Sequence, residues 1–357
     1  MTKIMKKSLI TVVLLFFAIT LFPTIIFSAD QPSVVIKFSQ WDGEVGMLEN
    51  IYPAYVQTFK SLVESKSNGK ITIQVFPNQQ LGSLPSTLEQ VYKGTIEMTS
   101  GQNTGLFASY YPDIAVFDIP FAFRDLLVAF EVAKGEFGIN MKKNIVEETG
   151  IRILSFLPTS YRNFGNNIRL IKEPNDLKGM KIRVMQGDIY MELMKVLGAN
   201  PVVIDAAELY TAIQTGVADG QENSPYNILG MKLEEVIDYY TLSAHLLNIA
   251  AVSINEKFFQ SLPKEYQKIV LDSARIAEIS MIGTAIAKEK NIDLKAIKKA
   301  GVEIYQPNEE EILKFKELAQ EPIKKLLVEK MRVNPATIDE MFQAIQEAEY
   351  KLDTLWY

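Results

Sequence analysis

The sequence predicts an α/β protein of two lobes, with one long helix that spans both of them. Strand and helix patterns alternate along the chain, and its length of 357 residues exceeds what a single hydrophobic core normally serves. Residues 263–299 also keep helical spacing over a stretch longer than one lobe of this size. With 48% hydrophobic and 22% charged residues, the composition is that of an ordinary globular protein and gives no sign of disorder.

The middle of the chain, residues 174–223, shows the clearest alternation. Residues 181–185 alternate polar and apolar side chains, which predicts a short strand with Arg183 near its centre. A helix at residues 188–197 and a second strand at residues 200–204 follow. Strand, helix and strand in this order form a parallel sheet, whose ligands bind outside the carboxyl ends of the strands. The segment therefore places a permanent cation close to a candidate binding site.

The flanking segments continue the same pattern. We expect further strands at residues 34–38, 71–76, 96–98, 151–156, 239–243, 251–255 and 301–304. We expect further helices at residues 84–92, 126–137, 139–148, 226–236, 309–330 and 335–352. Another helix is expected to end at Gly216, and Asp205 with Glu208 resembles a capping box at its start.

The helix expected at residues 263–299 determines how the lobes connect. At 1.5 Å per residue it is about 55 Å long, so we expect it to span both lobes and to bend, with Gly283 as one candidate place. The chain is expected to cross between the lobes at residues 157–159 and to return near residues 251–255. These crossings predict a first lobe of residues 30–159 plus 249–288 and a second lobe of residues 160–248 plus 289–357.

The first 29 residues have the layout of a secretory signal peptide. Three lysines, an apolar run at residues 9–22 and a small-residue end at Ser28 and Ala29 follow one another. An uncleaved membrane anchor is the alternative, although the apolar run is short for a hydrocarbon layer of about 30 Å. We therefore expect residues 1–29 to direct export to the periplasm.

Charge and cysteine content limit the partners. The chain has no cysteine, so an exported protein of this kind depends on its core rather than on disulfides. The formal net charge falls from −6 to −9 without the three leader lysines, because residues 1–29 contain no acid. An acidic surface argues against nucleic acid or an anionic membrane as partner. It also repels an anionic ligand at long range, so cations at a binding site must reverse the local field.

Most catalytic chemistries lack the residues they need. A Cys–His pair is excluded, and a Ser–His–acid triad has only His245 to use, without a Gly-x-Ser-x-Gly elbow. A lone histidine beside an apolar run is more often a structural hydrogen-bonding residue than a metal ligand. No phosphate or dinucleotide loop is present, so we expect neither metal nor cofactor. Carboxylates alone suffice for a glycosidase, and that alternative stays open.

Several motifs agree in order and spacing with one family. They are residues 176–183, 197–201, 208–212 and 219–223, with further matches at residues 75–82, 118–124 and 150–154. Together they resemble the substrate-binding subunit of tripartite ATP-independent periplasmic (TRAP) transporters, in the DctP-like branch. The resemblance implies a periplasmic-binding-protein-like fold whose two lobes close on an organic carboxylate: a dicarboxylate, keto acid or sugar acid. It also implies delivery to the membrane permease subunits and no enzymatic activity, and we expect a monomer.

On the matching positions, the resemblance implies a carboxylate clamp. Arg183 is its main cation, Arg162 is the second cation, and Asn223 donates its side-chain amide. Arginine suits this role because its planar fork binds a carboxylate through two parallel hydrogen bonds and keeps its charge.

Both Arg183 and Asn223 have a structural alternative. Arg183 is instead part of a salt bridge within the chain if it reaches an acid nearby, and the candidates are Asp188, Asp219 and Glu222. Asn223 instead forms an Asx turn before Pro225.

Loops at the ends of two expected strands add candidate ligand contacts. Trp41, after the strand at residues 34–38, either stacks on a ligand or packs at the surface. Gln102 and Asn103 follow the strand that begins at residues 96–98. Small polar residues at such a place present amides to a ligand, but they also suit any tight loop.

The chain departs from the family at Ala206, where an aromatic residue is usual. The site is then wider there, or another aromatic residue fills it, namely Phe164 or Tyr226. Asp205 lies just before this position and is a candidate to face a polar or cationic group of the ligand. This departure puts the usual small C4-dicarboxylate in doubt and adds a larger sugar acid, keto acid or other organic anion as an alternative.

Two classes of function remain after this reasoning. The first is an exported binding protein that captures an organic acid, for a permease or for a sensor kinase. The second is a secreted lyase or glycosidase that acts on carboxylates on a similar α/β scaffold.

Overall fold

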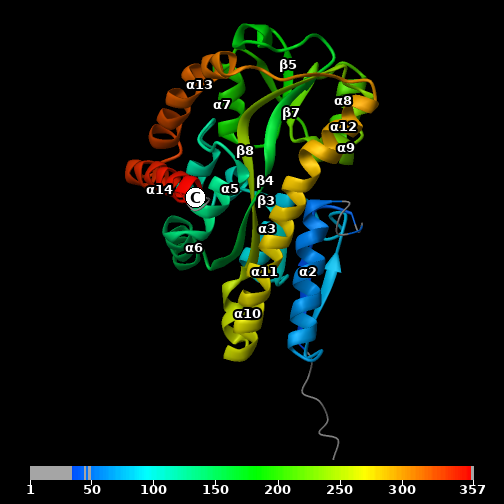
Figure 1. The fold of residues 1–357 in the computed structure, drawn as a ribbon. Coiled ribbons are helices and arrows are strands. Elements are labelled where there is room, and N and C mark those ends of the chain that lie inside the picture. Colours follow the sequence, from blue (N-terminus) through cyan, green and yellow to red (C-terminus); the bar gives the residue numbers. More distant parts are fainter. Residues whose placement is uncertain (1–33, 44–45, 47–49, 355–357) are drawn as a thin grey trace, which may run out of the picture. The chain divides into compact units, whose positions relative to one another are not determined.

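The computed structural model describes residues 34–43, 46 and 50–354. The expected signal peptide lies outside these residues. Residues from Val35 onward form one compact unit of mixed sheet and helix (Figure 1). Within the described part, no helix combines the length and the apolar character that crossing a membrane requires.

A nine-stranded sheet runs through the described residues in the order β2-β1-β3-β8-β4-β7-β5-β6, with β9 beside β8. Its strands are β1 Val34–Ser39, β2 Ile71–Phe76, β3 Met98–Asn103, β4 Ile151–Asn166, β5 Lys181–Val184, β6 Asn200–Val203, β7 Gly220–Asn223, β8 Tyr239–Asn255 and β9 Glu303–Tyr305. β5 is parallel to both of its neighbours, β6 and β7, as the strand–helix–strand pattern predicts.

β4 and β8 are long strands that pair antiparallel along their whole lengths. The sequence analysis placed separate short strands at residues 151–156, 239–243 and 251–255. This prediction is wrong in extent, because the pairing continues through the intervening residues. A register shift interrupts the ladder between Pro158 and Ser160, where the first crossing between lobes is expected.

The two lobes lie at opposite ends of the β4–β8 ladder. β3 pairs with β8 at residues 250–254, while β7 pairs with β4 at residues 163–166. β1, β2 and β3 therefore gather at one end, and β5, β6 and β7 gather at the other. This arrangement is the two-lobed α/β fold that the sequence predicts.

Helices cover the sheet (Figure 1). They are α2 Ile51–Lys66, α3 Leu84–Lys93, α4 Thr104–Phe107, α5 Leu126–Lys134, α6 Glu136–Thr149, α7 Asp188–Val196, α8 Leu209–Gln214, α9 Pro225–Gly230, α10 Glu256–Ser261, α11 Lys264–Lys288, α12 Leu294–Lys299, α13 Glu309–Glu329 and α14 Pro335–Thr354. The 3-10 turns are Pro112–Asp118, Pro174–Leu177, Ala206–Glu208 and Leu233–Glu235.

The long helix is interrupted by a π-helical turn, Glu289–Asp293, between α11 and α12. Gly283, the candidate place for a bend, lies within α11 and not at this interruption. A buried ion pair between Lys288 and Asp293, 3.2 Å apart, stabilises this turn. Ser160 of β4 also donates its hydroxyl to Glu289 at 3.2 Å. The helix is therefore interrupted where it contacts the crossing strand.

Each lobe has its own hydrophobic packing. In the second lobe one core combines residues from α8, α9, β8 and α12, namely Leu209, Ile213, Ala218, Ile228, Leu233, Ile237, Tyr240, Ile297 and Val302. In the first lobe, Phe38 of β1 packs edge to face on Phe59 of α2, with ring centroids 5.9 Å apart. α11 contacts α2 and β4, and α12 contacts α9, so the interrupted helix joins both lobes.

The last two helices pack on different lobes. α13 contacts α7, whereas α14 contacts α5 and α6. Ion pairs tie α14 in place, with Lys351 bound to Glu131 at 2.6 Å and Asp353 bound to Arg124 at 2.7 Å. The sequence analysis assigned residues 289–357 to the second lobe, and the contacts of α14 favour the first lobe instead. The rest of the division stays a prediction.

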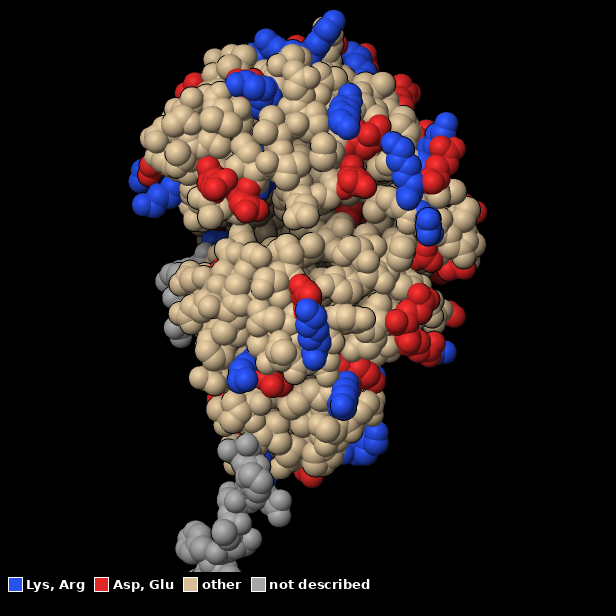
Figure 2. Space-filling view, turned by 180° about the vertical axis from the view of Figure 1, so that it is seen from behind, with Lys and Arg blue, Asp and Glu red and all other residues tan. Residues whose placement is uncertain are grey.

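Charged side chains of both signs are interspersed over the face of the molecule shown in Figure 2. Many charged side chains of the described residues pair along a helix, such as Lys60 with Glu64 and Lys324 with Glu321. Exposed pairs of this kind stabilise a fold by about 0–1 kcal/mol each, so burial of the two cores supplies most of the stability.

The start of α13 offers a test of local stability. Asn308 accepts a hydrogen bond from the Glu311 amide at 3.0 Å, and Glu311 accepts one from the Asn308 amide at 2.8 Å. Because Asn308→Ala removes one half of this capping box, we expect it to lower the free energy of unfolding by about 1 kcal/mol. Urea denaturation measures the change. Glu317→Ala, at an exposed position of the same helix, is the control and should change the stability by less.

Candidate functional site

A cavity of about 240 Å³ lies where the two lobes meet. Its walls come from the loop after β1, from α2, β3, β5, β7, α9 and β8, and from the turn before α8. The lining side chains include Trp41, Tyr52, Asn103, Arg162, Arg183, Gln186, Asp205, Asn223, Tyr226, Asn227 and Asn248. Both arginines of the predicted clamp therefore reach one cavity, together with the predicted Asn223.

Arg183 is fixed in the wall by a carbonyl group. It lies on β5 between Val202 of β6 and Gln221 of β7, and its side chain is 3% exposed. Its Nε donates to the Ile204 carbonyl at 2.7 Å. Within the described residues no carboxylate lies within salt-bridge distance of its guanidinium. Burial and the nearby charge of Arg162 lower the pKa of Arg183 to about 10, so it remains charged at neutral pH.

The acids that formed the structural alternative for Arg183 are engaged elsewhere. Asp219 lies 3.7 Å from Lys181, and Glu222 binds Arg162. Asp188 is exposed at the start of α7. The guanidinium of Arg183 is thus a buried cation without a protein counter-ion among the described residues, and its Nη groups are available to a ligand.

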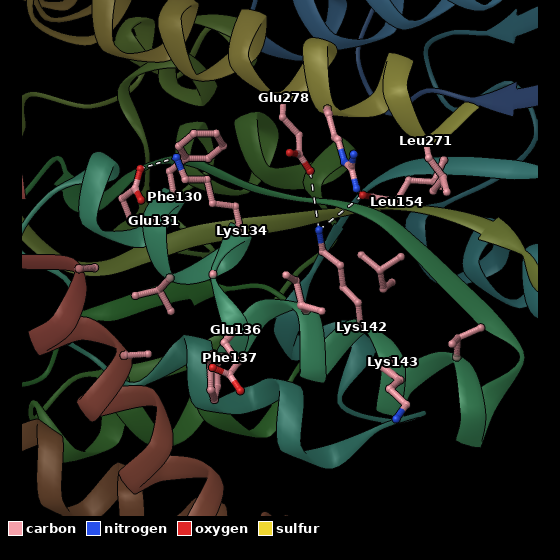
Figure 3. Close-up of a pocket in the computed structure, with 18 of the residues that line it drawn as sticks. Phe130, Glu131, Lys134, Glu136, Phe137, Lys142, Lys143, Leu154, Leu271 and Glu278 are labelled. Atoms are coloured by element: carbon pink, nitrogen blue, oxygen red, sulfur yellow. Dashed lines mark hydrogen bonds and ion pairs between the residues drawn. The ribbon is translucent and has the colours of Figure 1, made fainter. Parts of the chain in front are cut away.

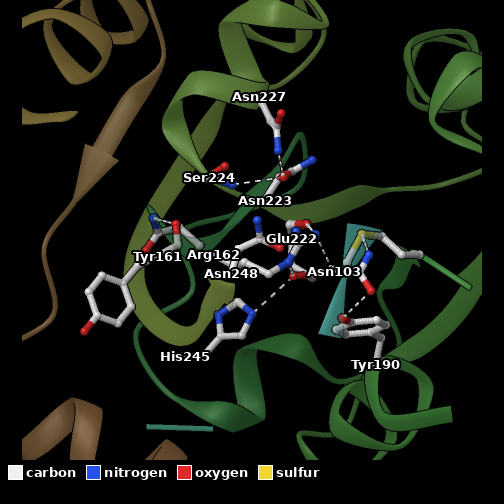
Figure 4. A network of polar contacts seen from close by, with 12 residues as sticks. Asn103, Tyr161, Arg162, Tyr190, Glu222, Asn223, Ser224, Asn227, His245 and Asn248 are labelled. Carbon is white, nitrogen blue, oxygen red and sulfur yellow. Dashed lines mark hydrogen bonds and ion pairs between the residues drawn. The ribbon is translucent and has the colours of Figure 1, made fainter. Parts of the chain in front are cut away.

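Arg162 is also in the wall, but its charge is already neutralised. Its Nη2 donates to Glu222 Oε1 at 2.8 Å and to the Glu222 carbonyl at 2.6 Å, and its Nε donates to Oε2 (Figure 4). Burial alone raises the pKa of Glu222, but the contacts with Arg162 and His245 together outweigh this effect and lower the pKa to about 2. Arg162 is therefore one half of a buried ion pair in the cavity wall, and its role as the second cation of the clamp stays a prediction.

The ion pair is backed by His245 and Phe164. His245 Nδ1 lies 2.8 Å from the Ser243 hydroxyl, and its Nε2 lies 3.5 Å from Glu222 (Figure 4). Its ring stacks on Phe164, with centroids 4.3 Å apart. Burial lowers the pKa of His245, which favours the neutral ring. These contacts give His245 the structural role that the sequence suggests.

Phe164 is fully buried behind the cavity rather than in it. The prediction that Phe164 fills the place of the missing aromatic residue is wrong. Residues two apart on a regular strand share a face, and Arg162 is in the cavity wall. A register shift between Arg162 and Phe164 breaks this relation, so the ring points into the core instead.

Asn223 lines the cavity, and two neighbouring residues hold its side-chain oxygen. Its Oδ1 accepts hydrogen bonds from the Ser224 amide at 3.0 Å and from Asn227 Nδ2 at 2.8 Å. An Asx turn requires the amide two residues on, and Pro225 at that position has none, so the structural alternative is not formed. Since both bonds use the carbonyl oxygen, the amide nitrogen of Asn223 is left to donate to a ligand in the cavity.

Gln102 and Asn103 separate because neighbouring residues of a strand point to opposite faces. Asn103 lines the cavity, as predicted. Gln102 is fully buried and donates to the hydroxyls of Thr99 at 2.7 Å and Thr87 at 3.2 Å. The contact role proposed for Gln102 is therefore wrong.

Trp41, Tyr226 and Asp205 also line the cavity, as the sequence analysis proposed. Asp205 makes no capping hydrogen bond, because a 3-10 turn separates it from α8. The predicted capping box of Asp205 and Glu208 is therefore wrong. The Asp205 side chain is exposed at the cavity wall instead.

Sequence reasoning missed several lining residues. They are mainly amides and one tyrosine: Tyr52, Gln79, Gln186, Asn227 and Asn248. The spacing of Asn227, four residues after Asn223 at the start of a helix, indicates that the two side chains lie close together. Asn227 could therefore have been predicted as a lining residue. The others lie on separate segments whose meeting depends on how the lobes pack, so no local pattern marks them.

The two lobes touch on both sides of the cavity. Tyr52 of α2 packs edge to face on Tyr226 of α9, with ring centroids 6.3 Å apart. On the other side, the Tyr190 hydroxyl of α7 donates to Asn103 at 3.2 Å. Gly105 of α4 also lies so close that an added Cβ would be 2.7 Å from this hydroxyl. A ligand in the cavity is therefore enclosed by residues of both lobes.

A larger groove of about 1090 Å³ lies among α5, α6, α11 and α14 (Figure 3). Every cation that lines it has an acid within 4.0 Å; the pairs are Lys134–Glu131, Lys142–Glu278, Lys143–Glu147, Arg152–Glu256, Arg275–Asp272 and Lys351–Glu131. The groove therefore offers no free cation to an anion, and the smaller cavity with Arg183 is the stronger candidate site. No group of three or more His, Asp or Glu side chains in the described part is arranged to hold a metal ion.

A two-lobed α/β fold with a ligand-sized cavity between the lobes is typical of solute-binding proteins. Residues 44–330 match the family DctP, described as bacterial extracellular solute-binding protein, family 7, and the chain belongs to this family. This result confirms the resemblance found in the sequence.

Relatives in the family differ in their ligands. The chain is 32% identical to the 2,3-diketo-L-gulonate-binding periplasmic protein YiaO of Escherichia coli K12, over 69% of this chain and 74% of the relative. It is 34% identical to the C4-dicarboxylate-binding periplasmic protein DctP of Rhodobacter capsulatus, over 68% and 72%. A TRAP periplasmic solute-binding protein from Ochrobactrum anthropi, with its C-terminus bound in the ligand pocket, matches at a TM-score of 0.81 and 31% identity, over 91% and 99%.

The buried ion pair makes a prediction about stability. Glu222→Gln leaves the Arg162 guanidinium buried without its counter-ion, so we expect a loss of about 3–5 kcal/mol in the free energy of unfolding at pH 7. The matched control is Glu256→Gln, whose partner Arg152 is 25% exposed, and a smaller loss of about 1 kcal/mol is expected there. Equal losses in the two variants, measured in urea, would contradict this account.

The same pair predicts a dependence on pH. The folded-state pKa of Glu222, about 2, lies below its usual value of 4.5, so this carboxylate contributes stability that is present above pH 4.5. The contribution is lost as the pH falls toward 2, because the unfolded chain takes up the proton first. Denaturation between pH 6 and pH 3 should show a steeper decline for the native protein than for Glu222→Gln.

Proposed function

We propose that the protein is the exported solute-binding subunit of a TRAP transporter. It captures an organic carboxylate between its lobes in the periplasm and delivers it to the membrane permease subunits. Residues 1–29 act as the signal peptide, and the protein is not an enzyme. The family membership and the named relatives support this proposal.

The observation that carries the proposal is the state of Arg183. A buried charge without a counter-ion costs on the order of several kcal/mol, unless water or a ligand solvates it. The Ile204 carbonyl fixes the guanidinium through Nε, which leaves the Nη groups directed to other partners. A ligand carboxylate removes the cost and forms two parallel hydrogen bonds with the fork. The cavity is therefore prepared for one anionic group.

Closure of the lobes gives the ligand its affinity. Arg183 and Asn223 lie in the second lobe as the sequence divides the chain, whereas Trp41, Tyr52 and Asn103 lie in the first. A ligand contacts both groups only when the lobes are together, so it stabilises the closed state by its differential affinity. Micromolar binding corresponds to about 8 kcal/mol, which a charged clamp and apolar burial together supply.

The enzymatic alternative lacks a suitable pair of groups in the cavity. A glycosidase needs two carboxyl groups about 5–10 Å apart that flank the bond to be broken. Asp205 is the one acid among the described lining residues. Glu222 is bound to Arg162, and His245 lies behind it against Phe164. These positions favour binding over catalysis.

Replacing Arg183 tests the proposal. We expect Arg183→Ala to abolish the thermal shift that organic acids produce, while the unliganded variant stays folded, because the carboxylate loses its clamp. A ligand at about 1,000 times its dissociation constant adds about 4 kcal/mol of stability, so the loss is easy to detect. The ligand should also be recovered unchanged after long incubation with the native protein.

Arg169→Ala is the matched control for this experiment. Its guanidinium also donates to main-chain carbonyls, those of Asp176 at 2.9 Å and Lys178 at 3.2 Å, but it lies outside the cavity. This variant should retain the thermal shift. Normal binding by Arg183→Ala would refute the clamp, and turnover of the ligand would support the enzymatic alternative.

Replacing Gly105 tests the role of closure. A methyl group at this position lies 2.7 Å from the Tyr190 hydroxyl, so Gly105→Ala must push the lobes apart or displace Tyr190. We expect affinity to fall by roughly tenfold or more, with the unliganded fold intact. Gly283→Ala is the control, because nothing lies within 4 Å of its added Cβ. Unchanged affinity in Gly105→Ala, measured by calorimetry, would show that this contact does not limit closure.

A further inference from the structure

We propose that Asp205 sets the ligand class, so that the cavity takes a monocarboxylate that carries several hydroxyl groups and rejects dicarboxylates. The inference rests on the proposed function, because it requires Arg183 to hold the ligand carboxylate. It goes further by giving a role to the one acidic side chain that lines the cavity among the described residues.

The charges in the cavity wall accommodate one carboxylate. Arg162 and Arg183 are the cations among the described lining residues. Glu222 neutralises Arg162 through two side-chain hydrogen bonds, so only Arg183 carries a charge that a ligand can balance. A second carboxylate on the ligand finds no free cation among the described residues of this wall to balance its charge.

Asp205 places a negative charge on the same wall. It directly follows Ile204, whose carbonyl holds Arg183, so the backbone links the cation and the acid. The carboxylate of Asp205 has no hydrogen bond or ion pair to another described residue and is exposed at the cavity. It influences Arg183 through space without pairing with it. A dicarboxylate that binds Arg183 therefore brings its second charge toward a like charge, a repulsion that acts against such ligands.

The same carboxylate needs a donor from the ligand, since an ionised carboxylate only accepts hydrogen bonds. Ligand hydroxyls meet this need, and the rest of the wall suits them. The lining includes the amides of Gln79, Gln186, Asn103, Asn223, Asn227 and Asn248. An amide both donates and accepts, which matches a hydroxyl group better than it matches a methylene or an ammonium group. A hydroxylated chain with one carboxylate therefore fits the wall as a whole.

Calorimetric titration with four kinds of probe tests the inference. The probes are a set of six-carbon aldonates and uronates, hexanoate, succinate and 6-aminohexanoate. We expect at least one hydroxylated monocarboxylate to bind roughly tenfold or more tightly than each of the other three. Asp205→Asn should reduce its preference over succinate by roughly tenfold, because the repulsion of the second carboxylate disappears. Glu208→Gln, an equal change of charge in the same turn but outside the lining, should leave the preference unchanged.

Three results would overturn the inference. They are succinate binding as tightly as the best hydroxylated acid, tighter binding of 6-aminohexanoate, and an unchanged preference in Asp205→Asn. In each case, if the ligand binds the native protein but not Arg183→Ala, the proposed function still holds. Failure of this inference is therefore distinguishable from failure of the proposed function. If no carboxylate in the set binds the native protein, this inference fails, whereas the proposed function fails only when no organic acid of any class binds.

Discussion

The burial of an arginine without an acid beside it is the constraint on which the site depends. Elsewhere in the cavity wall the buried cation Arg162 is matched by Glu222, and the groove near α6 pairs each of its cations with an acid. Arg183 is the exception, held by the Ile204 carbonyl instead. Because the described part of the chain supplies no counter-ion for this buried charge, an anionic ligand that pairs with it is bound more tightly.

The rest of the fold holds that cation where the proposed closure of the lobes takes place. β4 and β8 run through both lobes as one antiparallel ladder, and the long helix passes between them with a π-helical turn at Glu289–Asp293. The turn contacts Ser160 beside the register shift in β4. The irregular pairing of β4 lies beside the π turn of the helix. The three connections between the lobes, β4, β8 and the long helix, therefore share one place to bend. Closure then brings Tyr52 onto Tyr226 and Asn103 onto Tyr190 around the ligand.

The sequence reveals the fold and the centre of the site, because both are encoded locally. The alternation around Arg183 predicts parallel strands, and the motifs that contain Arg183 and Asn223 identify the family. Residues 151–166 and 239–255 were harder to interpret, since short apolar runs do not show that a strand continues through both lobes. Gln102 and Phe164 were misplaced because one step along a strand, or one register shift, reverses the face of a side chain. The partner of Arg162 was also out of reach, because a tertiary contact between β4 and β7 supplies it.

The most direct test of the central claim is a crystal structure of the protein with its organic acid bound. The account predicts the ligand carboxylate at hydrogen-bond distance, about 2.7–2.9 Å, from both Nη atoms of Arg183, with Arg162 still bound to Glu222. A carboxylate bound to Arg162 in place of Glu222, or one that leaves the Arg183 fork without a partner, would contradict it.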